Sequence, residues 1–191
     1  NLAILSRNRE IVSRLFESIY LGIKTTDPRA IMMMVNNDPL MGELLDLNKF
    51  NSKKQLANIL FKDLITLLLK ELEERESGNK TRPLDMYLFI SGLQRVPGLT
   101  RHDADAELQK QFTKLLNSGP IYGINTIAFS TDMDPYNRII NLFRYRTATY
   151  TDRETSRAFL QNRKDANEIG EWRGVLYDYN YDEIIKYKPY V

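Results

Sequence analysis

A short polar turn near the start of the chain carries two arginines that could bind an anion. It reads Ser6-Arg7-Asn8-Arg9-Glu10 and separates a short apolar run from residues with helical spacing. The N-terminus of a helix attracts negative charge, and Arg7 and Arg9 would add two cations there. The turn could therefore form an anion pocket, although arginines in such a turn can also be solvated loop residues.

The same turn lacks the parts of a phosphate cradle. A P-loop needs glycines, so that backbone N–H groups can approach the β- and γ-phosphates, a lysine for their charge, and a Ser or Thr for Mg²⁺. Residues 6–13 contain neither glycine nor lysine. We therefore expect the bulky side chains of this turn to obstruct a cradled triphosphate.

The most continuous apolar run of the chain ends in a serine. Residues 85–93 read Asp-Met-Tyr-Leu-Phe-Ile-Ser-Gly-Leu. A run of this kind, with β-forming residues at its centre, predicts a strand that is buried on both faces. In nucleotide-hydrolysing α/β domains an acid that holds Mg²⁺ often closes such a strand. Here the closing residue is Ser91, which cannot replace that acid.

Polar side chains also follow another apolar run. Residues 123–129 predict a buried strand, and Ser130, Thr131 and Asp132 come directly after it. Ligands of open α/β sheets bind beyond the carboxyl ends of the strands, which makes these residues candidate ligand contacts. A plain polar turn is the alternative.

Basic residues outnumber acids between positions 138 and 165. The basic residues are Arg138, Arg144, Arg146, Arg153, Arg157, Arg163 and Lys164, against Asp152, Glu154 and Asp165. Such a stretch could contact DNA phosphates, or project toward a neighbouring subunit's nucleotide as an arginine finger. A solvated, partly salt-bridged edge is the alternative.

The composition limits the chemistry that is possible. The chain has 191 residues, 42% of them hydrophobic, which suffices for one domain with a full core. It has no cysteine, so zinc sites with thiolate ligands are excluded. It has a single histidine, His102, so we expect neither a histidine-based metal cluster nor Ser-His-Asp catalysis. The net charge of +2 does not argue for nucleic acid or a membrane surface. We expect a cytoplasmic domain without direct membrane insertion, because no apolar run approaches the ~20 residues of a membrane helix.

Alternating strands and helices must position these residues. Apolar runs predict six strands, at 2–5, 30–35, 86–92, 123–129, 144–150 and 172–179. Helical spacing predicts helices at 11–23, 56–72, 108–116 and 152–160, with a short one behind Pro135. This alternation predicts an α/β fold with a doubly wound, mostly parallel sheet and helices on both faces. No linker or repeat divides residues 1–191, so we expect a single domain.

Finer features of these elements can also be predicted. Ser52 and Gln55 form a capping box for the second helix, and Thr100 and Asp103 are candidate caps for the third. The strand at 144–150 alternates basic or polar residues with others and should be more exposed. The tyrosine-rich tail, residues 181–191, could stack on bases of single-stranded nucleic acid. Without interleaved glycines we expect it to pack on the domain or on another subunit.

Several segments follow one another in an order typical of a known family. They are Leu88-Phe89-Ile90, residues 119–127, Ser130-Thr131, Arg144-Tyr145-Arg146 and Ser156-Arg157. In this order they resemble the Walker B strand, the segment entering the next strand, the polar sensor residues, the arginine-bearing strand and the Ser-Arg helix of FtsK/SpoIIIE-type P-loop ATPases. These are RecA-like motors that pump DNA or power secretion.

The resemblance implies a RecA-like P-loop NTPase fold, in a family that uses ATP and Mg²⁺. It makes Arg144, Arg146 and Arg157 candidate arginine fingers or DNA contacts. It also gives equivalents of the family's nucleotide site, namely Arg7, Asn8, Arg9, Glu10, Ser91, Ser130 and Thr131. Because the glycines, the lysine and the acid are missing, we expect a degenerate site, without catalytic residue, metal, bound cofactor or intrinsic ATPase activity.

We therefore expect a structural or regulatory module of a DNA-translocating or secretion motor. The chain starts in a strand pattern without an initiator methionine, so we expect a piece of a longer multidomain protein. Its partner would be an adjacent ATPase domain or subunit of the same assembly, with DNA as a further candidate, in a complex that can be anchored to a membrane. Two alternatives stay open: ATP hydrolysis at a composite site completed by a neighbouring subunit or domain, and a DNA-binding module.

Overall fold

The computed structural model contains one seven-stranded sheet and describes residues 1–46, 50, 60–79, 83–100, 102–149, 151–161 and 173–188. The strand order is β2-β3-β4-β1-β5-β6-β7. The pairs from β2 to β5 are parallel, whereas β5–β6 and β6–β7 are antiparallel. The prediction of a doubly wound, mostly parallel α/β sheet is confirmed.

Strands and helices alternate along most of the described chain. The strands are β1 (Leu2–Leu5), β2 (Ile31–Asn36), β3 (Met86–Ser91), β4 (Ile124–Ser130), β5 (Tyr145–Ala148), β6 (Gly174–Asp178) and β7 (Glu183–Tyr187). The α-helices are α1 (Arg9–Thr26), α2 (Pro39–Leu44), α4 (Phe61–Glu76), α5 (Ala106–Ser118) and α6 (Arg153–Phe159). Short 3₁₀ turns are η2 (Leu93–Arg95), η3 (Gly119–Tyr122), η4 (Asp134–Tyr136) and η5 (Ile140–Leu142). None of the described helices is long and apolar enough to cross a membrane.

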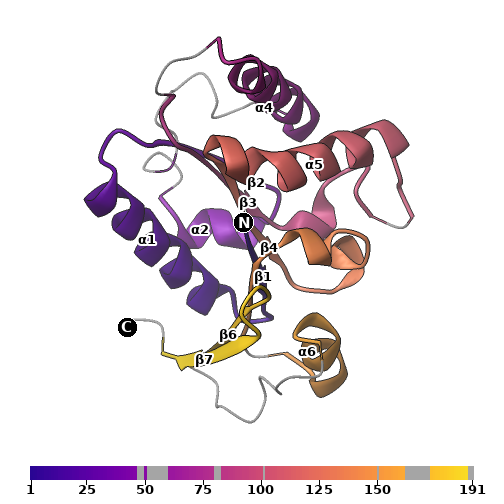
Figure 1. Cartoon of the computed structure of the whole chain (residues 1–191). Coiled ribbons are helices and arrows are strands. Elements are labelled where there is room, and N and C mark those ends of the chain that lie inside the picture. Colours follow the sequence, from indigo (N-terminus) through magenta and orange to yellow (C-terminus); the bar gives the residue numbers. More distant parts are fainter. Residues whose placement is uncertain are drawn as a thin grey trace.

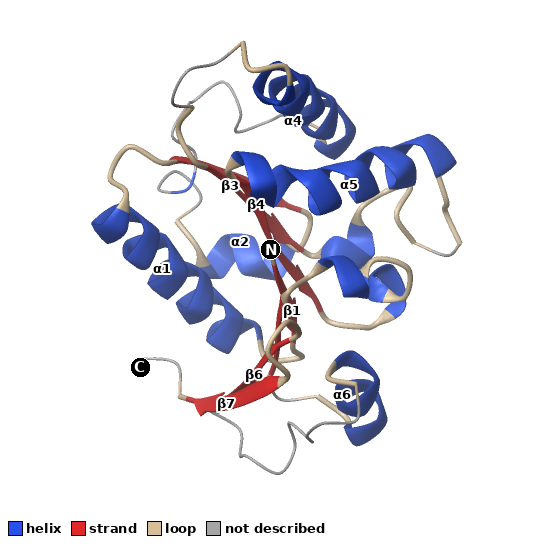
Figure 2. Cartoon of the chain, in the orientation of Figure 1, coloured by secondary structure: helices blue, strands red, loops and turns tan. Residues whose placement is uncertain are grey.

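Helices cover both faces of the sheet. Figure 1 shows α1 and α2 on one side of the strands and α4, α5 and α6 on the other. Figure 2 shows the sheet as the layer between them. Phe89 of β3 joins Phe16 of α1 in one core cluster, whereas Leu88 and Ile90 join Phe112 of α5 in the other. This split arises because successive side chains of a strand point to opposite faces, so an uninterrupted apolar strand requires helices on both.

The C-terminal residues form a hairpin rather than a tail. The segment Glu183–Tyr187 pairs with β6 along its whole length, a strand that the interpretation of residues 181–191 as a tyrosine-rich tail did not include. Tyr187 lies so close to Gly174 that a Cβ there would meet the tyrosine ring at 2.3 Å. The hydroxyl of Tyr187 is 2.5 Å from Oγ1 of Thr147 on β5. The expectation that tyrosines of this segment pack on the domain is confirmed for Tyr187, while Tyr190 lies outside the described residues.

Strand β5 is buried, which corrects the prediction of a more exposed strand at 144–150. Arg146, Thr147 and Ala148 are all buried. The strand pairs with β1 on one side and with β6 on the other. The alternating pattern was misleading because the hairpin of β6 and β7 covers the side of β5 that would otherwise face solvent.

The start of α5 also differs from the prediction. Its N-cap is Asp105, whose Oδ1 accepts hydrogen bonds from the amides of Glu107 and Leu108 at 3.0 Å each. The predicted cap Asp103 instead accepts from the amide of Gly98 at 3.2 Å. The helix expected behind Pro135 consists of the two 3₁₀ turns η4 and η5. The capping box at 52–55 lies outside the described residues.

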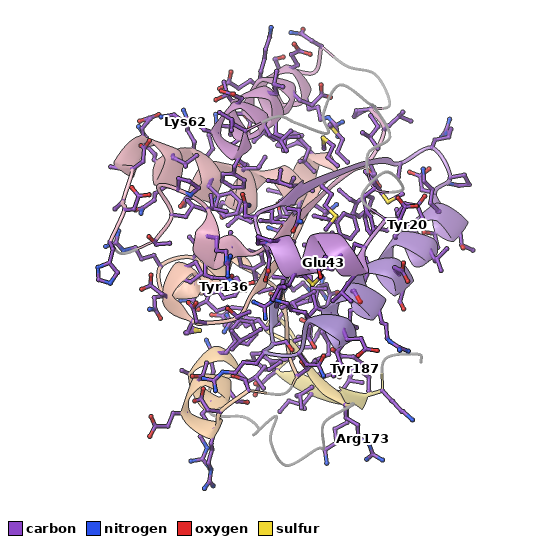
Figure 3. All side chains as sticks on the ribbon, turned by 180° about the vertical axis from the view of Figure 1, so that it is seen from behind. Tyr20, Glu43, Lys62, Tyr136, Arg173 and Tyr187 are labelled. Atoms are coloured by element: carbon purple, nitrogen blue, oxygen red, sulfur yellow. The ribbon has the colours of Figure 1, made fainter. Side chains whose placement is uncertain are left out.

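A buried tyrosine fixes the segment after β4 to the centre of the sheet. The hydroxyl of Tyr136 lies 3.1 Å from the carbonyl oxygen of Ile4 and 2.6 Å from that of Ala128. Its ring makes edge contacts with Phe143 and Phe159. Figure 3 shows Tyr136 among the central elements of the molecule. Burial raises the pKa of Tyr136 well above its ordinary value, so its hydroxyl stays protonated as a donor.

Burial also raises the pKa of Tyr187, to about 12, from ~10 for a free tyrosine. Between these values the unfolded chain has lost a proton that the folded chain keeps, so stability falls as the pH rises. This stabilisation is complete below pH ~10, and we expect a loss of up to ~2 kcal/mol in the free energy of unfolding by pH ~12. Urea unfolding at several pH values should show a smaller alkaline loss for Tyr187→Phe than for the wild type. Exposed Tyr179→Phe is the control, and equal losses in the two variants would contradict the assignment.

Candidate functional site

The carboxyl ends of five parallel strands meet at one edge of the sheet. The register places Leu5 beside Ser130 and beside Ala148, and Asn36 beside Ser91. We call the residues that end or follow these strands the carboxyl edge: residues 6–10, 36–38, 91–92, 130–132, 149 and 151–152. The candidate residues Arg7, Asn8, Arg9, Glu10, Ser91, Ser130 and Thr131 therefore lie at one edge, where ligands of open α/β sheets bind.

The turn between β1 and α1 is very short. Three residues, Ser6, Arg7 and Asn8, separate the last residue of the strand from the first residue of the helix. None of them has a positive φ. A backbone nest for an anion alternates right- and left-handed residues so that successive N–H groups converge. The turn does not have this conformation, and its amides are not arranged as a phosphate cradle.

Several polar groups of the turn are bonded within the chain. The amide of Ser6 donates to the carbonyl of Ser130 at 3.2 Å, and the amide of Asn8 donates to Ser6 Oγ at 2.9 Å. The hydroxyl of Thr149, after β5, donates to the same Ser6 Oγ. Asn8 caps α1, because its Oδ1 accepts the amide of Ile11 at 3.2 Å. Part of the positive end of the helix is thereby satisfied by the chain itself.

Arg9 makes a buried ion pair with an aspartate at the carboxyl edge. Its Nε lies 2.7 Å from Oδ2 of Asp38, whose side chain has 0% exposure. Asp38 is also the N-cap of α2 and accepts the amide of Leu40 at 3.2 Å. The pair joins the first turn of α1 to the start of α2. The charge of Arg9 is therefore already matched inside the protein.

Arg7 pairs at the surface with Asp152, the N-cap of α6. Nη2 of Arg7 lies 2.8 Å from Oδ2 of Asp152, and the two side chains are 59% and 39% exposed. Hydrogen bonds from Thr155, with the nearby charge of Arg7, hold the pKa of Asp152 below its ordinary value. Both arginines of the turn thus have carboxylate partners. This arrangement lies between the two interpretations of the sequence, an anion pocket with two available cations and a turn of solvated loop residues.

Ser91 ends β3 at the carboxyl edge and is fully buried. Its Oγ has no hydrogen-bond partner among the described residues. The next residue, Gly92, has φ 74°, and a Cβ there would lie 2.8 Å from the backbone nitrogen of Asp38. A larger residue at Gly92 would therefore collide with the loop after β2. Within the described residues no group of three or more His, Cys, Asp or Glu side chains is arranged to hold a metal ion.

The polar residues after β4 form a turn that bonds mainly to itself. Ser130 Oγ donates to the carbonyl of Asp132 at 2.8 Å and accepts the amide of Asp132 at 3.3 Å. The amide of Thr131 donates to Gln94 Oε1 at 3.3 Å, which ties this turn to η2. Burial raises the pKa of Asp132. These contacts are those of an ordered polar turn at the carboxyl edge.

The three candidate finger or DNA-contact arginines have different environments. Arg144 makes a two-point pair with Asp178, with contacts of 3.2 and 3.0 Å. Arg146 is fully buried, donates to Phe143 and Asn141, and lies 4.9 Å from the ring centre of Tyr179. Arg157 is exposed on α6. Arg144 precedes β5 and Arg146 is its second residue, so both lie toward the end of that strand opposite the carboxyl edge. Arg163 and Lys164 lie outside the described residues.

Asp38 and Asp152 were not predicted as partners of the two arginines. Both carry an N-cap signal, since Asp38 precedes a proline and Asp152 precedes a helical pattern. An N-cap signal predicts where the helix begins, but it does not predict which arginine the aspartate pairs with. The pairs join residues 29 and 145 positions apart, which only the tertiary fold brings together.

The strand order and the two helical layers define the class of fold, a RecA-like P-loop NTPase fold with two antiparallel strands added at one edge. More specifically, the chain has the fold of FtsK/SpoIIIE-type ATPases. No protein-family model matches the sequence, and no curated protein matches it either.

Three solved structures illustrate this similarity. The DNA-packaging ATPase B204 from Sulfolobus Turreted Icosahedral Virus has a TM-score of 0.65 at 13% identity, with 100% of this chain and 97% of that chain covered. The cytoplasmic domain of the Thermomonospora curvata type VII secretion ATPase EccC has a TM-score of 0.68 at 15% identity, with 99% and 25% covered. The pCW3 conjugation coupling protein TcpA with ATPγS has a TM-score of 0.64 at 17% identity, with 99% and 59% covered.

The two ion pairs of the turn should differ greatly in their effect on stability. Arg9→Ala leaves the buried carboxylate of Asp38 without its cation, and we expect a loss of about 3 kcal/mol in the free energy of unfolding. Arg7→Ala removes only an exposed pair and should cost less than ~1 kcal/mol. Urea unfolding of the two variants at neutral pH measures both values. Similar losses in the two variants would show that the Arg9–Asp38 pair is not the buried contact described above.

Proposed function

We propose that this chain is a motor-type α/β module that does not hydrolyse ATP by itself. The observation that supports this most directly is the three-residue β1–α1 turn, in which no residue has a positive φ. Phosphoryl transfer needs little covalent chemistry from the protein and depends on positioned charges and amides. A turn without a nest of amides cannot supply that positioning, so we expect neither ATP nor Mg²⁺ as a cofactor.

The remaining parts of the carboxyl edge support the same proposal. Ser91 stands where a carboxylate would hold the metal, and it is fully buried. The cation nearest to the helix start, Arg9, is held by Asp38. A triphosphate would have to displace this buried pair, which costs several kcal/mol when one partner is left behind.

The proposed role is contact with an adjacent ATPase domain or subunit of the same assembly. The chain covers 25% of the EccC structure and 59% of the TcpA structure, so the same fold occurs there as part of a larger protein. A module of this kind would be structural or regulatory, relaying the movements of an active neighbour in a DNA-translocating or secretion motor. We place it on the cytoplasmic side of such a complex.

Isothermal titration with Mg-ATP tests the proposal on the isolated chain. We expect no saturable binding at micromolar ATP and no release of phosphate, because the turn offers no cradle and β3 offers no acid. The DNA-packaging ATPase B204, measured in the same buffer, is the positive control. Micromolar binding together with turnover by this chain would overturn the proposal.

The same measurement on the parent assembly addresses a composite site. We expect hydrolysis there to persist in Arg157→Ala, as it should in the control Arg153→Ala on the same helix. Arg157 is the cleaner choice because replacing buried Arg146 would also disturb the packing of β5 and β6. Hydrolysis that is lost in Arg157→Ala alone would instead assign the domain a catalytic part at a neighbour's nucleotide.

A further inference from the structure

A cavity of about 570 Å³ lies on the α5 side of the sheet, and none of its lining residues belongs to the β1–α1 turn. Its walls are the loop after η2, the N-terminal half of α5, and the segment 134–139 that follows β4. Figure 1 shows α5 beside that segment. The volume falls within the range of small-molecule sites, roughly 300–1,000 Å³.

Part of the cavity lining is apolar. The apolar residues of the lining include Leu99, which is partly exposed, together with Ile139 and Phe112, which are buried. Segment 134–139 cannot easily shift, because Tyr136 bonds to the carbonyls of two central strands. Thr100 and Thr113 add hydroxyl groups to the lining. The lining therefore combines apolar side chains with a larger number of polar and charged ones, and such a mixed lining can bind a ligand that has both an apolar and a polar part.

Two cations line the same cavity. Nη1 of Arg138 donates to Oε1 of Gln109 at 2.9 Å, and Nε2 of Gln109 donates to the carbonyl of Gly98 at 3.3 Å. This relay orients the exposed guanidinium of Arg138 toward Gln109 without neutralising it. Among the described residues, neither Arg138 nor Lys110 has a carboxylate within ion-pair distance, although Asp134 also belongs to the lining.

We propose that this cavity binds a small organic anion with an apolar body. The anionic group lies between Lys110 and Arg138, whose ammonium and guanidinium groups favour charge-assisted hydrogen bonds. The apolar body lies against Leu99 and Ile139 and is removed from water. This site is independent of the proposed function, since it requires neither an active nor a degenerate nucleotide site.

Two fluorescent probes separate the contributions of charge and of apolar burial. The anionic probe is 8-anilinonaphthalene-1-sulfonate, and N-phenyl-1-naphthylamine has the same aromatic body without the sulfonate. We expect both to bind the full chain with one-to-one stoichiometry. In Lys110→Gln/Arg138→Gln the anionic probe should bind about tenfold more weakly or worse, because two charged contacts are lost. Binding of the neutral probe should change by less than about twofold.

Two further variants control for general effects. Lys70→Gln/Arg29→Gln removes the same charge at exposed positions away from the cavity and should leave both affinities unchanged. Thr113→Trp places a large side chain in the cavity from an exposed helix position and should abolish binding of both probes. Urea midpoints equal to the wild type show that each variant is folded. Unchanged binding of the anionic probe in the first double variant, or of both probes in Thr113→Trp, would overturn the site.

Discussion

The parallel pairing of β1 between β4 and β5 is the constraint on which the carboxyl edge depends. It places the ends of these strands in register, so that Ser6, Ser130 and Thr149 meet whatever the loops contain. Helices must then cover both faces, because the central strands are apolar on both sides. The shape of this fold is thus set by strand pairing and burial rather than by the groups that would contact a phosphate.

The chemistry of the carboxyl edge depends on atoms other than those that set the strand order and the core. A phosphate site is built mainly from backbone N–H groups, whose direction is set by φ and ψ rather than by the strand order. Here the chain passes from β1 to α1 in three residues, and Asn8 and Arg9 bond to groups of the protein. The strand order therefore does not determine whether the edge can bind a ligand. Fold similarity alone does not distinguish them.

The parts of the fold that could be predicted from the sequence are those governed by local patterns. Continuous apolar runs located β1 to β4, and helical spacing located α1, α5 and α6, because burial imposes these periods directly. The partners of Arg7 and Arg9 could not be predicted, since they depend on residues brought near by strand order. The burial of β5 was missed for the same reason, because it depends on a hairpin formed later in the chain.

The hairpin also changes how the arginines of β5 should be interpreted. In the sequence, Arg144 and Arg146 stand in a basic stretch that suits nucleic acid or a neighbouring nucleotide. In the structure, Arg144 is paired with Asp178 and Arg146 is enclosed by tyrosines of β6 and its following turn. Burial lowers the pKa of Arg146, because removal from water disfavours its charged form. Arg146 would have to leave these contacts to reach another molecule, whereas the side chain of Arg144 is still 38% exposed in its pair with Asp178. A basic sequence stretch therefore does not by itself predict a basic surface where an antiparallel edge covers the strand.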